Sequence, residues 1–161
     1  MLAQLHRFKP TANRTAAQPP QQRPRGADGL IRVRSAYGFE ESIDRLRQAI
    51  AARGIPFFGA VDQARLAAGA GIRLRPSTLL VFGTPSLGAQ FLSSNPYAGL
   101  DWPIRLLVHQ DSTGAVWVAY TDFTWIARRR GIGELHEQSV LTAGIVDSIA
   151  SAVRAPLSWS N

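Results

Sequence analysis

The feature that most constrains the fold of this chain is an uncharged run that ends at a glycine-rich corner. Residues 77–82, Ser-Thr-Leu-Leu-Val-Phe, carry no charge and predict a strand in the interior of a sheet. Gly83, Thr84 and Pro85 follow, and residues 87–93 then predict a helix. A strand, a turn and the start of a helix therefore meet within a few residues.

The rest of the chain predicts further strands and helices in alternation. Strands are expected at residues 30–35, 56–61, 104–110 and 116–121, and helices at residues 39–53, 62–68, 123–130 and 140–153. The turn residues Asp111-Ser112-Thr113-Gly114 make 104–121 the clearest hairpin. We therefore expect an α+β fold, with helices packed on a mixed or antiparallel sheet.

Gly83 and Gly88 have the G-x-x-x-x-G spacing of a phosphate-binding loop. Such a loop needs a Lys and then a hydroxyl residue after the second glycine, where this chain has Ala89 and Gln90. A nucleotide triphosphatase is therefore disfavoured. Two interpretations stay open: the glycines only shape a tight turn, or the free amides at the helix start hold a small anion beside Thr84 and Ser86.

Charge and composition divide the chain into three parts. Residues 1–29 are rich in Pro and Gln, and their five basic residues against Asp28 give +4 of the net charge of +7. We expect a disordered basic tail over 1–29, a single globular domain over 30–155 and a C-terminal extension over 156–161. The tail keeps a nucleic-acid-binding alternative open, although nucleic acid is not the favoured partner.

The same composition limits the chemistry and the location. The chain has no Cys, which excludes disulfides and thiolate sites. Its three histidines, His6, His109 and His136, lack the spacing of a metal site, so we expect no metal and no cofactor. There is no apolar stretch long enough to span a membrane and no secretory signal, which favours a cytoplasmic protein.

Several short motifs occur in an order that resembles the domain-of-unknown-function 302 family, over about residues 30–132. They are Phe39-Glu40-Glu41-Ser42, Phe57-Phe58-Gly59-Ala60-Val61-Asp62, Leu74-Arg75-Pro76-Ser77, Val81-Phe82-Gly83 with Pro85 and Gly88, Leu100-Asp101-Trp102-Pro103, and Tyr120-Thr121-Asp122. The resemblance implies a small α+β fold, similar in outline to one repeat of the TATA-box-binding-protein architecture, and often a homodimer. It implies no reaction, since the family has none assigned.

This chain departs from the family pattern at several positions. Gln63 stands where members of the family commonly have His, Thr84 where they have Asn, and Ala89 where they have Thr. Gln63 donates and accepts hydrogen bonds but carries no proton at neutral pH. Any acid–base chemistry that depends on that His is therefore lost here.

The favoured function is a homodimeric module that binds a small molecule or anion, without catalysis. The expected ligand-binding residues cluster at strand ends: Asp62, Gln63, Gly83, Thr84, Ser86, Gly88 and Asp101. Trp117 alternates with apolar neighbours and is the best candidate for a covered dimer surface. The alternatives are an enzyme that uses an acid–base pair among Asp62, Asp101 and His109, and nucleic-acid binding through the basic tail.

Overall fold

The computed structural model of the protein describes residues 27–156. Most of the predicted tail and extension, 1–26 and 157–161, therefore lies outside the described residues. The elements, in chain order, are β1 (Leu30–Arg34), α1 (Phe39–Ala52), β2 (Phe57–Asp62), α2 (Gln63–Gly69), β3 (Ser77–Phe82), α3 (Pro85–Ser94), η1 (Pro96–Leu100), β4 (Ile104–Gln110), β5 (Val116–Thr121), α4 (Phe123–Arg130), η2 (Gly133–Leu135), α5 (His136–Ala150) and η3 (Ser151–Val153).

The strands form one five-stranded sheet in the order β1-β5-β4-β3-β2. Every neighbouring pair is antiparallel, so of the two arrangements expected from the sequence the sheet adopts the antiparallel one. The uncharged strand β3 pairs on both sides, with β2 and β4, as its composition predicted. The α+β fold is confirmed.

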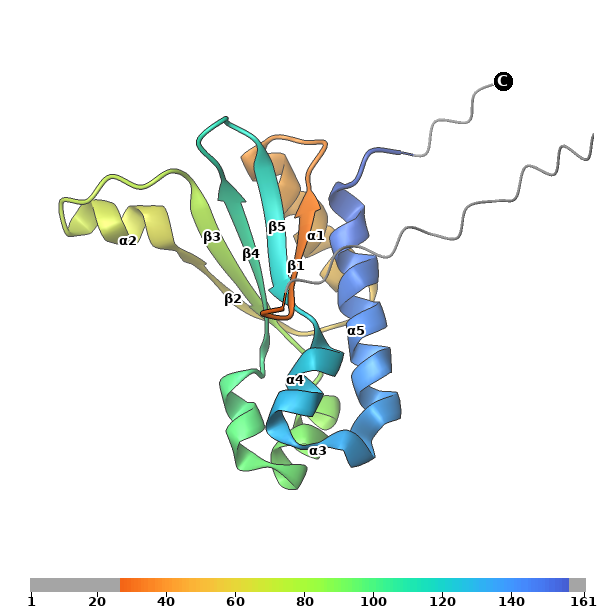
Figure 1. Cartoon of the computed structure of the whole chain (residues 1–161). Coiled ribbons are helices and arrows are strands. Elements are labelled where there is room, and N and C mark those ends of the chain that lie inside the picture. Colours follow the sequence, from red (N-terminus) through yellow and green to blue (C-terminus); the bar gives the residue numbers. More distant parts are fainter. Residues whose placement is uncertain (1–26, 157–161) are drawn as a thin grey trace, which may run out of the picture.

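One face of the sheet is covered by α1 and α5 (Figure 1). Alternate residues of β3, namely Thr78, Leu80 and Phe82, are buried on this face. From the helices, Leu46 of α1 and Ile149 of α5 are fully buried against it. Each such side chain stabilises the fold by about 1.5 to 3 kcal/mol relative to an exposed position, so these helices are fixed on the sheet.

The opposite face of the sheet, which we call the open face, remains partly exposed. It carries the other residues of each strand in the alternation, because successive side chains of a strand point to opposite faces. These residues are Arg32 and Arg34 of β1, Leu79 and Val81 of β3, Arg105, Leu107 and His109 of β4, and Trp117 and Ala119 of β5. The open face is therefore apolar at its centre and carries three arginines.

The turn of the β4–β5 hairpin is held by the carboxylate of Asp111. Its Oδ1 accepts hydrogen bonds from the Thr113 amide at 2.8 Å and the Thr113 hydroxyl at 2.7 Å, and its Oδ2 accepts one from Trp117 Nε1 at 2.8 Å. These bonds favour the ionised carboxylate and hold the pKa of Asp111 well below its ordinary value of 3.8. Gly114 completes the turn with φ at 85°.

The acid stability of the protein is expected to depend on Asp111. Because its pKa is lowered in the folded state, its contribution is fully present above pH 4 and is lost as the pH falls below about 4. Asp111→Asn is therefore expected to be less stable than the wild type at pH 7, with a difference that shrinks steadily towards pH 2. Urea unfolding followed by circular dichroism across this range measures it, and a difference independent of pH would contradict the assignment.

Candidate functional site

The structure divides the residues predicted for a ligand site between the two ends of β3. Gly83, Thr84, Ser86, Gly88 and Asp101 lie at the Phe82 end, where Phe82 pairs with Ile104. Asp62 and Gln63 lie at the other end, where Asp62 pairs with Thr78. Four residues of strand separate these ends by about 13 Å, so a single small ligand does not contact both groups.

Asp62 and Gln63 have local structural partners. Asp62 Oδ1 accepts a hydrogen bond from the Arg65 amide at 2.9 Å and caps α2. Gln63 Oε1 accepts a hydrogen bond from the Ser77 hydroxyl at 2.7 Å and joins α2 to the start of β3.

The glycines of the corner provide space for the indole ring of Trp102. A Cβ atom added at Gly88 would overlap the ring carbons of Trp102, and one added at Gly83 would lie 2.9 Å from its Nε1. Neither glycine has a positive φ, so the corner does not need glycine for its backbone angles. The G-x-x-x-x-G spacing therefore reflects tertiary packing, a role the sequence analysis did not consider.

Few amides at the start of α3 are available to a ligand. Pro85 has no N–H, and the amides of Leu87 and Gly88 donate to the Thr84 carbonyl at 3.1 and 3.0 Å. Thr84 occupies the N-cap position, but its side chain makes no capping hydrogen bond. Within the described residues, the amides of Thr84 and Ser86 are the donors of this turn that have no backbone partner. Few free amides therefore remain to bind a small anion at this helix start.

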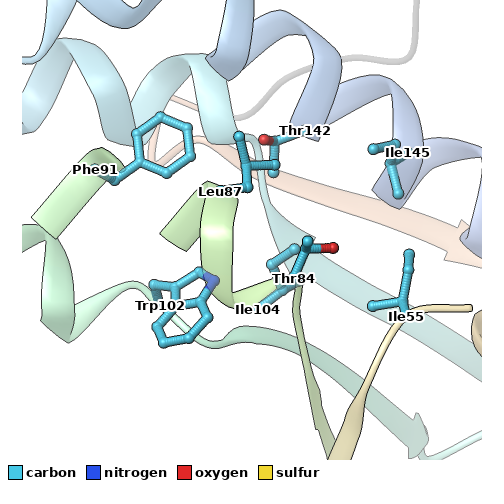
Figure 2. Close-up of a pocket in the computed structure, with 8 residues that line it drawn as sticks. All are labelled: Ile55, Thr84, Leu87, Phe91, Trp102, Ile104, Thr142 and Ile145. Atoms are coloured by element: carbon cyan, nitrogen blue, oxygen red, sulfur yellow. The ribbon is translucent and has the colours of Figure 1, made fainter. Parts of the chain in front are cut away.

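Figure 2 shows the residues that line the cavity beside this corner, which come from α3, the start of β4, α5 and the connecting segments. Its volume is about 10 Å³, which is enough for about one water molecule. Six of the eight lining side chains are apolar: Ile55, Leu87, Phe91, Trp102, Ile104 and Ile145, with Thr84 and Thr142. Thr142 already donates to the Gln138 carbonyl at 2.7 Å. The cavity is too small for a metabolite.

Asp101 links the segment before β4 to the end of α4. Its Oδ2 lies 2.6 Å from Arg130 Nε, and its Oδ1 lies 3.8 Å from Arg105 Nη2. The Arg130 carbonyl also accepts a hydrogen bond from Asn95 Nδ2 at 2.6 Å. Asp101 therefore forms ion pairs that join the segment before β4 to the end of α4. The sequence motif alone did not indicate this role.

The three residues of the enzyme alternative do not form an acid–base pair. Asp62 shares a face of the sheet with Thr78, whereas His109 pairs with Ser77 and lies on the opposite face. Asp101 precedes β4 and His109 lies near the end of that strand. The structure thus separates each possible pair by the sheet or by the length of a strand.

A larger concavity lies where β4 and β5 separate. Their pairing runs from Gln110–Val116 to Leu107–Ala119 and ends there, although both strands continue. Residues 120 and 121 of β5 pair instead with β1 on their other side. We call the resulting gap the β4–β5 cleft. Its volume is about 550 Å³, within the range of small-molecule sites.

The β4–β5 cleft combines apolar walls with a charged mouth. Ile104, Phe123, Ile126 and Val146 form its deep part, and Leu79, Leu107 and Ala119 extend it onto the open face. The polar side chains around it are Arg32, Arg105, Asp101, His109, Tyr120 and Thr121. Because strand residues direct their backbone groups alternately to either side, part of the backbone of β4 and β5 also faces this gap.

Of the residues singled out from the sequence, Asp101 and His109 line this cleft. The sequence analysis missed Arg32 and Arg105. Their signal was the alternation in Leu30-Ile31-Arg32-Val33-Arg34 and Ile104-Arg105-Leu106-Leu107, which places each arginine on the face opposite the buried residues. The strand order that brings β1 near β4 was not evident from local patterns.

The sequence of residues 31–153 matches a known protein family. The family model described as "Domain of unknown function DUF302" matches residues 31–153. The chain belongs to this family. The match covers every element from β1 to η3 and extends the resemblance seen in the sequence through α5. A crystal structure of an uncharacterized conserved protein DUF302 from Bacillus stearothermophilus has the same fold, with a TM-score of 0.72, 19% identity, and coverage of 80% of this chain and 100% of that one.

Two curated relatives are named as ion channels. The "Fluoride-specific ion channel FluC 1" of Brucella suis biovar 1 (strain 1330) is 33% identical over 129 residues, which is 80% of this chain and 46% of the relative. The protein of the same name from Brucella abortus biovar 1 (strain 9-941) is also 33% identical over 129 residues, 44% of its length. This DUF302 chain thus spans less than half the length of these relatives.

Within residues 27–156, no helix of this DUF302 domain combines the length and the apolar character needed to cross a bilayer.

The packing of Trp102 on the corner predicts opposite effects for two glycine substitutions. Gly88→Ala is expected to lower the free energy of unfolding by about 1 to 3 kcal/mol, because its methyl group overlaps the indole. Gly144→Ala in α5, where nothing lies within 4 Å of the added Cβ, is expected to raise it by about 0.5 to 1 kcal/mol. Urea unfolding measures both, and equal effects would contradict the packing role.

Proposed function

We propose that this protein is a binding module for a small amphipathic anion, and that the β4–β5 cleft is its site. The apolar part of the ligand lies between the strands against Ile104, Leu107 and Ala119, and its anionic group faces Arg105 and Arg32. The observation that carries this proposal is a cleft of about 550 Å³ with apolar walls and two arginines at its mouth. The proposal moves the ligand from the glycine corner to the neighbouring cleft and retains Asp101 at its edge.

The two arginines are available to a ligand because their present partners hold them weakly. Arg105 Nη2 lies 3.8 Å from Asp101 and donates to the Leu100 carbonyl at 2.8 Å. Arg32 Nη2 lies 3.7 Å from Asp28, and both of those side chains are more than half exposed. Exposed ion pairs of this length contribute little, whereas a guanidinium has five donors to offer a carboxylate, sulfonate or phosphate.

The ligand is expected to be organic, with an apolar body. Apolar side chains outnumber polar ones along the cleft, and an ion that is strongly hydrated gains nothing by contact with them. Fluoride, the ion in the name of the Brucella relatives, is such an ion. We propose that the segment of those channels similar to this chain is a ligand-binding domain joined to the rest of the protein, and that this chain supplies the same module.

Binding of 8-anilinonaphthalene-1-sulfonate and of decanoate to the full chain tests the site. At about −0.3 kcal/mol per non-hydrogen atom, a dissociation constant of order 10 to 100 µM is expected for the sulfonate, which has about 20 such atoms, and one of order 1 to 10 mM for decanoate, which has about 12. Arg105→Gln is expected to weaken binding about three- to tenfold through the lost charge-assisted hydrogen bond. Ala119→Leu fills the cleft and is expected to abolish binding. Fluorescence titration and thermal shift measure both.

The controls separate the cleft from general surface affinity. Arg34→Gln removes an arginine of the open face that does not line the cleft, and it is expected to leave binding unchanged. Decanol reports the contribution of the anionic group, and sodium fluoride is expected to give no shift. Binding that survives Ala119→Leu, or that Arg34→Gln weakens as much as Arg105→Gln, would refute the proposal.

We also propose that the module is a homodimer through its open face. Leu79, Val81 and Leu107 are only half-buried there, and Trp117 lies on the same face. A second copy seated on this face would also close the mouth of the cleft. An anionic ligand would then offset the repulsion between the arginines of the two copies.

Val81→Lys tests this surface without entering the cleft. Val81 lies on the open face opposite Arg105, and its side chain is outside the cleft lining. A lysine there is expected to convert a dimer to a monomer in multi-angle light scattering, with little change in thermal stability, because the side chain is not fully buried. A wild-type monomer at 100 µM protein, with and without decanoate, would exclude the dimer.

A further inference from the structure

A second surface, distinct from the β4–β5 cleft, stands at the far edge of the sheet. Strand β2 is an edge strand, and α2 continues from it away from the body of the molecule before the chain returns to β3 (Figure 1). We call residues 57–76 the β2–α2 arm. No residue of α2 is buried, and every residue from Gly69 to Pro76 is exposed. The arm is therefore a protruding segment whose surface is open to a partner.

The β2–α2 arm is unusually apolar for such an exposed segment. Five of the nine large apolar side chains that are exposed in residues 27–156 lie on it: Phe58, Val61, Leu66, Ile72 and Leu74, with exposed fractions of 50%, 40%, 66%, 57% and 50%. Within α2, the less exposed residues Gln63, Ala64 and Ala67 lie towards β3, and Leu66 lies on the outer side. Phe58 lies at the other end of β2, with its ring centroid 6.0 Å from that of Trp102, so the apolar surface of α2 and the loop after it consists of Leu66, Ile72 and Leu74. Exposed apolar side chains concentrated on a protruding segment mark an interaction site.

The same arm is basic. Arg65, Arg73 and Arg75 are all exposed, and none of them forms an ion pair within residues 27–156. The single acidic residue of the arm is Asp62, whose carboxylate caps α2. The surface thus presents apolar side chains interspersed with three cations and one anion, a net charge of +2.

The combination of apolar side chains and positive charge on the arm favours one kind of binding partner over the others. A second copy of the arm would bring like charges together, and the register shift between Phe57 and Gly59 interrupts the regular edge that another strand would need. A nucleic acid would satisfy the arginines but would leave the leucines and isoleucine in water. A bilayer with anionic headgroups satisfies both, because apolar side chains enter its acyl boundary while arginines reach the phosphates.

We propose that the β2–α2 arm docks the protein on the surface of membranes that contain anionic lipid. Leu66, Ile72 and Leu74 insert among the acyl chains near the headgroups, and Arg65, Arg73 and Arg75 contact lipid phosphates with their long stems lying along the apolar layer. The protein lies on the bilayer through this arm and does not span it. No residue of the arm lines the β4–β5 cleft, so docking does not use that site.

Co-sedimentation of the full chain with vesicles tests this docking. Binding is expected to vesicles of phosphatidylcholine with 30% phosphatidylglycerol, and not to vesicles of phosphatidylcholine alone. Leu66→Ser combined with Leu74→Ser retains every charge of the chain, including the basic residues of the tail, and is expected to weaken binding about tenfold or more. Arg73→Gln combined with Arg75→Gln is expected to weaken it by about fivefold for each arginine.

A matched control removes two exposed apolar side chains elsewhere. Val140 and Leu141 of α5 are 49% and 58% exposed, and Val140→Ser with Leu141→Ser is expected to leave vesicle binding unchanged. Circular dichroism and urea unfolding of each variant confirm that it is folded. An Ile72→Trp variant adds a readout at the proposed point of insertion, since its fluorescence, compared with that of the wild type, is expected to shift to shorter wavelength on anionic vesicles.

Three outcomes would overturn the proposal. The first is no binding to anionic vesicles, or binding that the arm variants leave unchanged, which would assign any attraction to the basic tail. The second is self-association that the Leu66→Ser, Leu74→Ser variant abolishes, which would make the arm a contact between copies. The third is arm-dependent binding to duplex DNA without binding to vesicles. None of these outcomes bears on ligand binding in the β4–β5 cleft.

Discussion

The central strand β4 pairs with β3 along almost its whole length but with β5 along only part of it, and much of the molecule follows from this asymmetry. From Leu107 to Gln110 the strand is joined on both sides; from Ile104 to Leu106 it is joined on one side only. At the same level, β5 remains paired with β1, and α4 and α5 place Phe123 and Val146 beneath the gap. The sheet is therefore continuous near the β4–β5 turn, whereas at its other end the two strands separate and leave the β4–β5 cleft.

Local patterns were sufficient to predict most of the elements. The β4–β5 hairpin has the predicted bounds, because Asp111 and Gly114 supply a turn that leaves little choice of register. The cap of α2 by Asp62 and the left-handed φ of 64° at Gly131 after α4 also follow from adjacent residues. Such features depend on contacts a few residues apart, which a linear sequence contains in full.

The site could not be predicted in the same way, because its parts are distant in the sequence. Gly83 and Gly88 resembled a ligand loop, yet the decisive neighbour is Trp102, which reaches them only after α3 and η1 have turned the chain back. Arg32 and Arg105 come together only through the strand order β1-β5-β4. Of the predicted ligand-binding residues, Asp101 lines the β4–β5 cleft, and the separation of strands that forms this cleft could not be predicted from local patterns.

The packing of Trp102 against Gly83 and Gly88 limits which residues can replace these three positions in other members of the family. The indole occupies the space that a side chain at position 88 would need. The size of the residue at position 88 therefore limits the size of the residue at position 102, and the reverse. A relative with alanine or serine at the position of Gly88 is expected to carry a smaller ring or an aliphatic residue at the position of Trp102. Replacements at these two positions are therefore expected to occur in pairs, and a side chain introduced at position 88 alone is expected to collide with the indole.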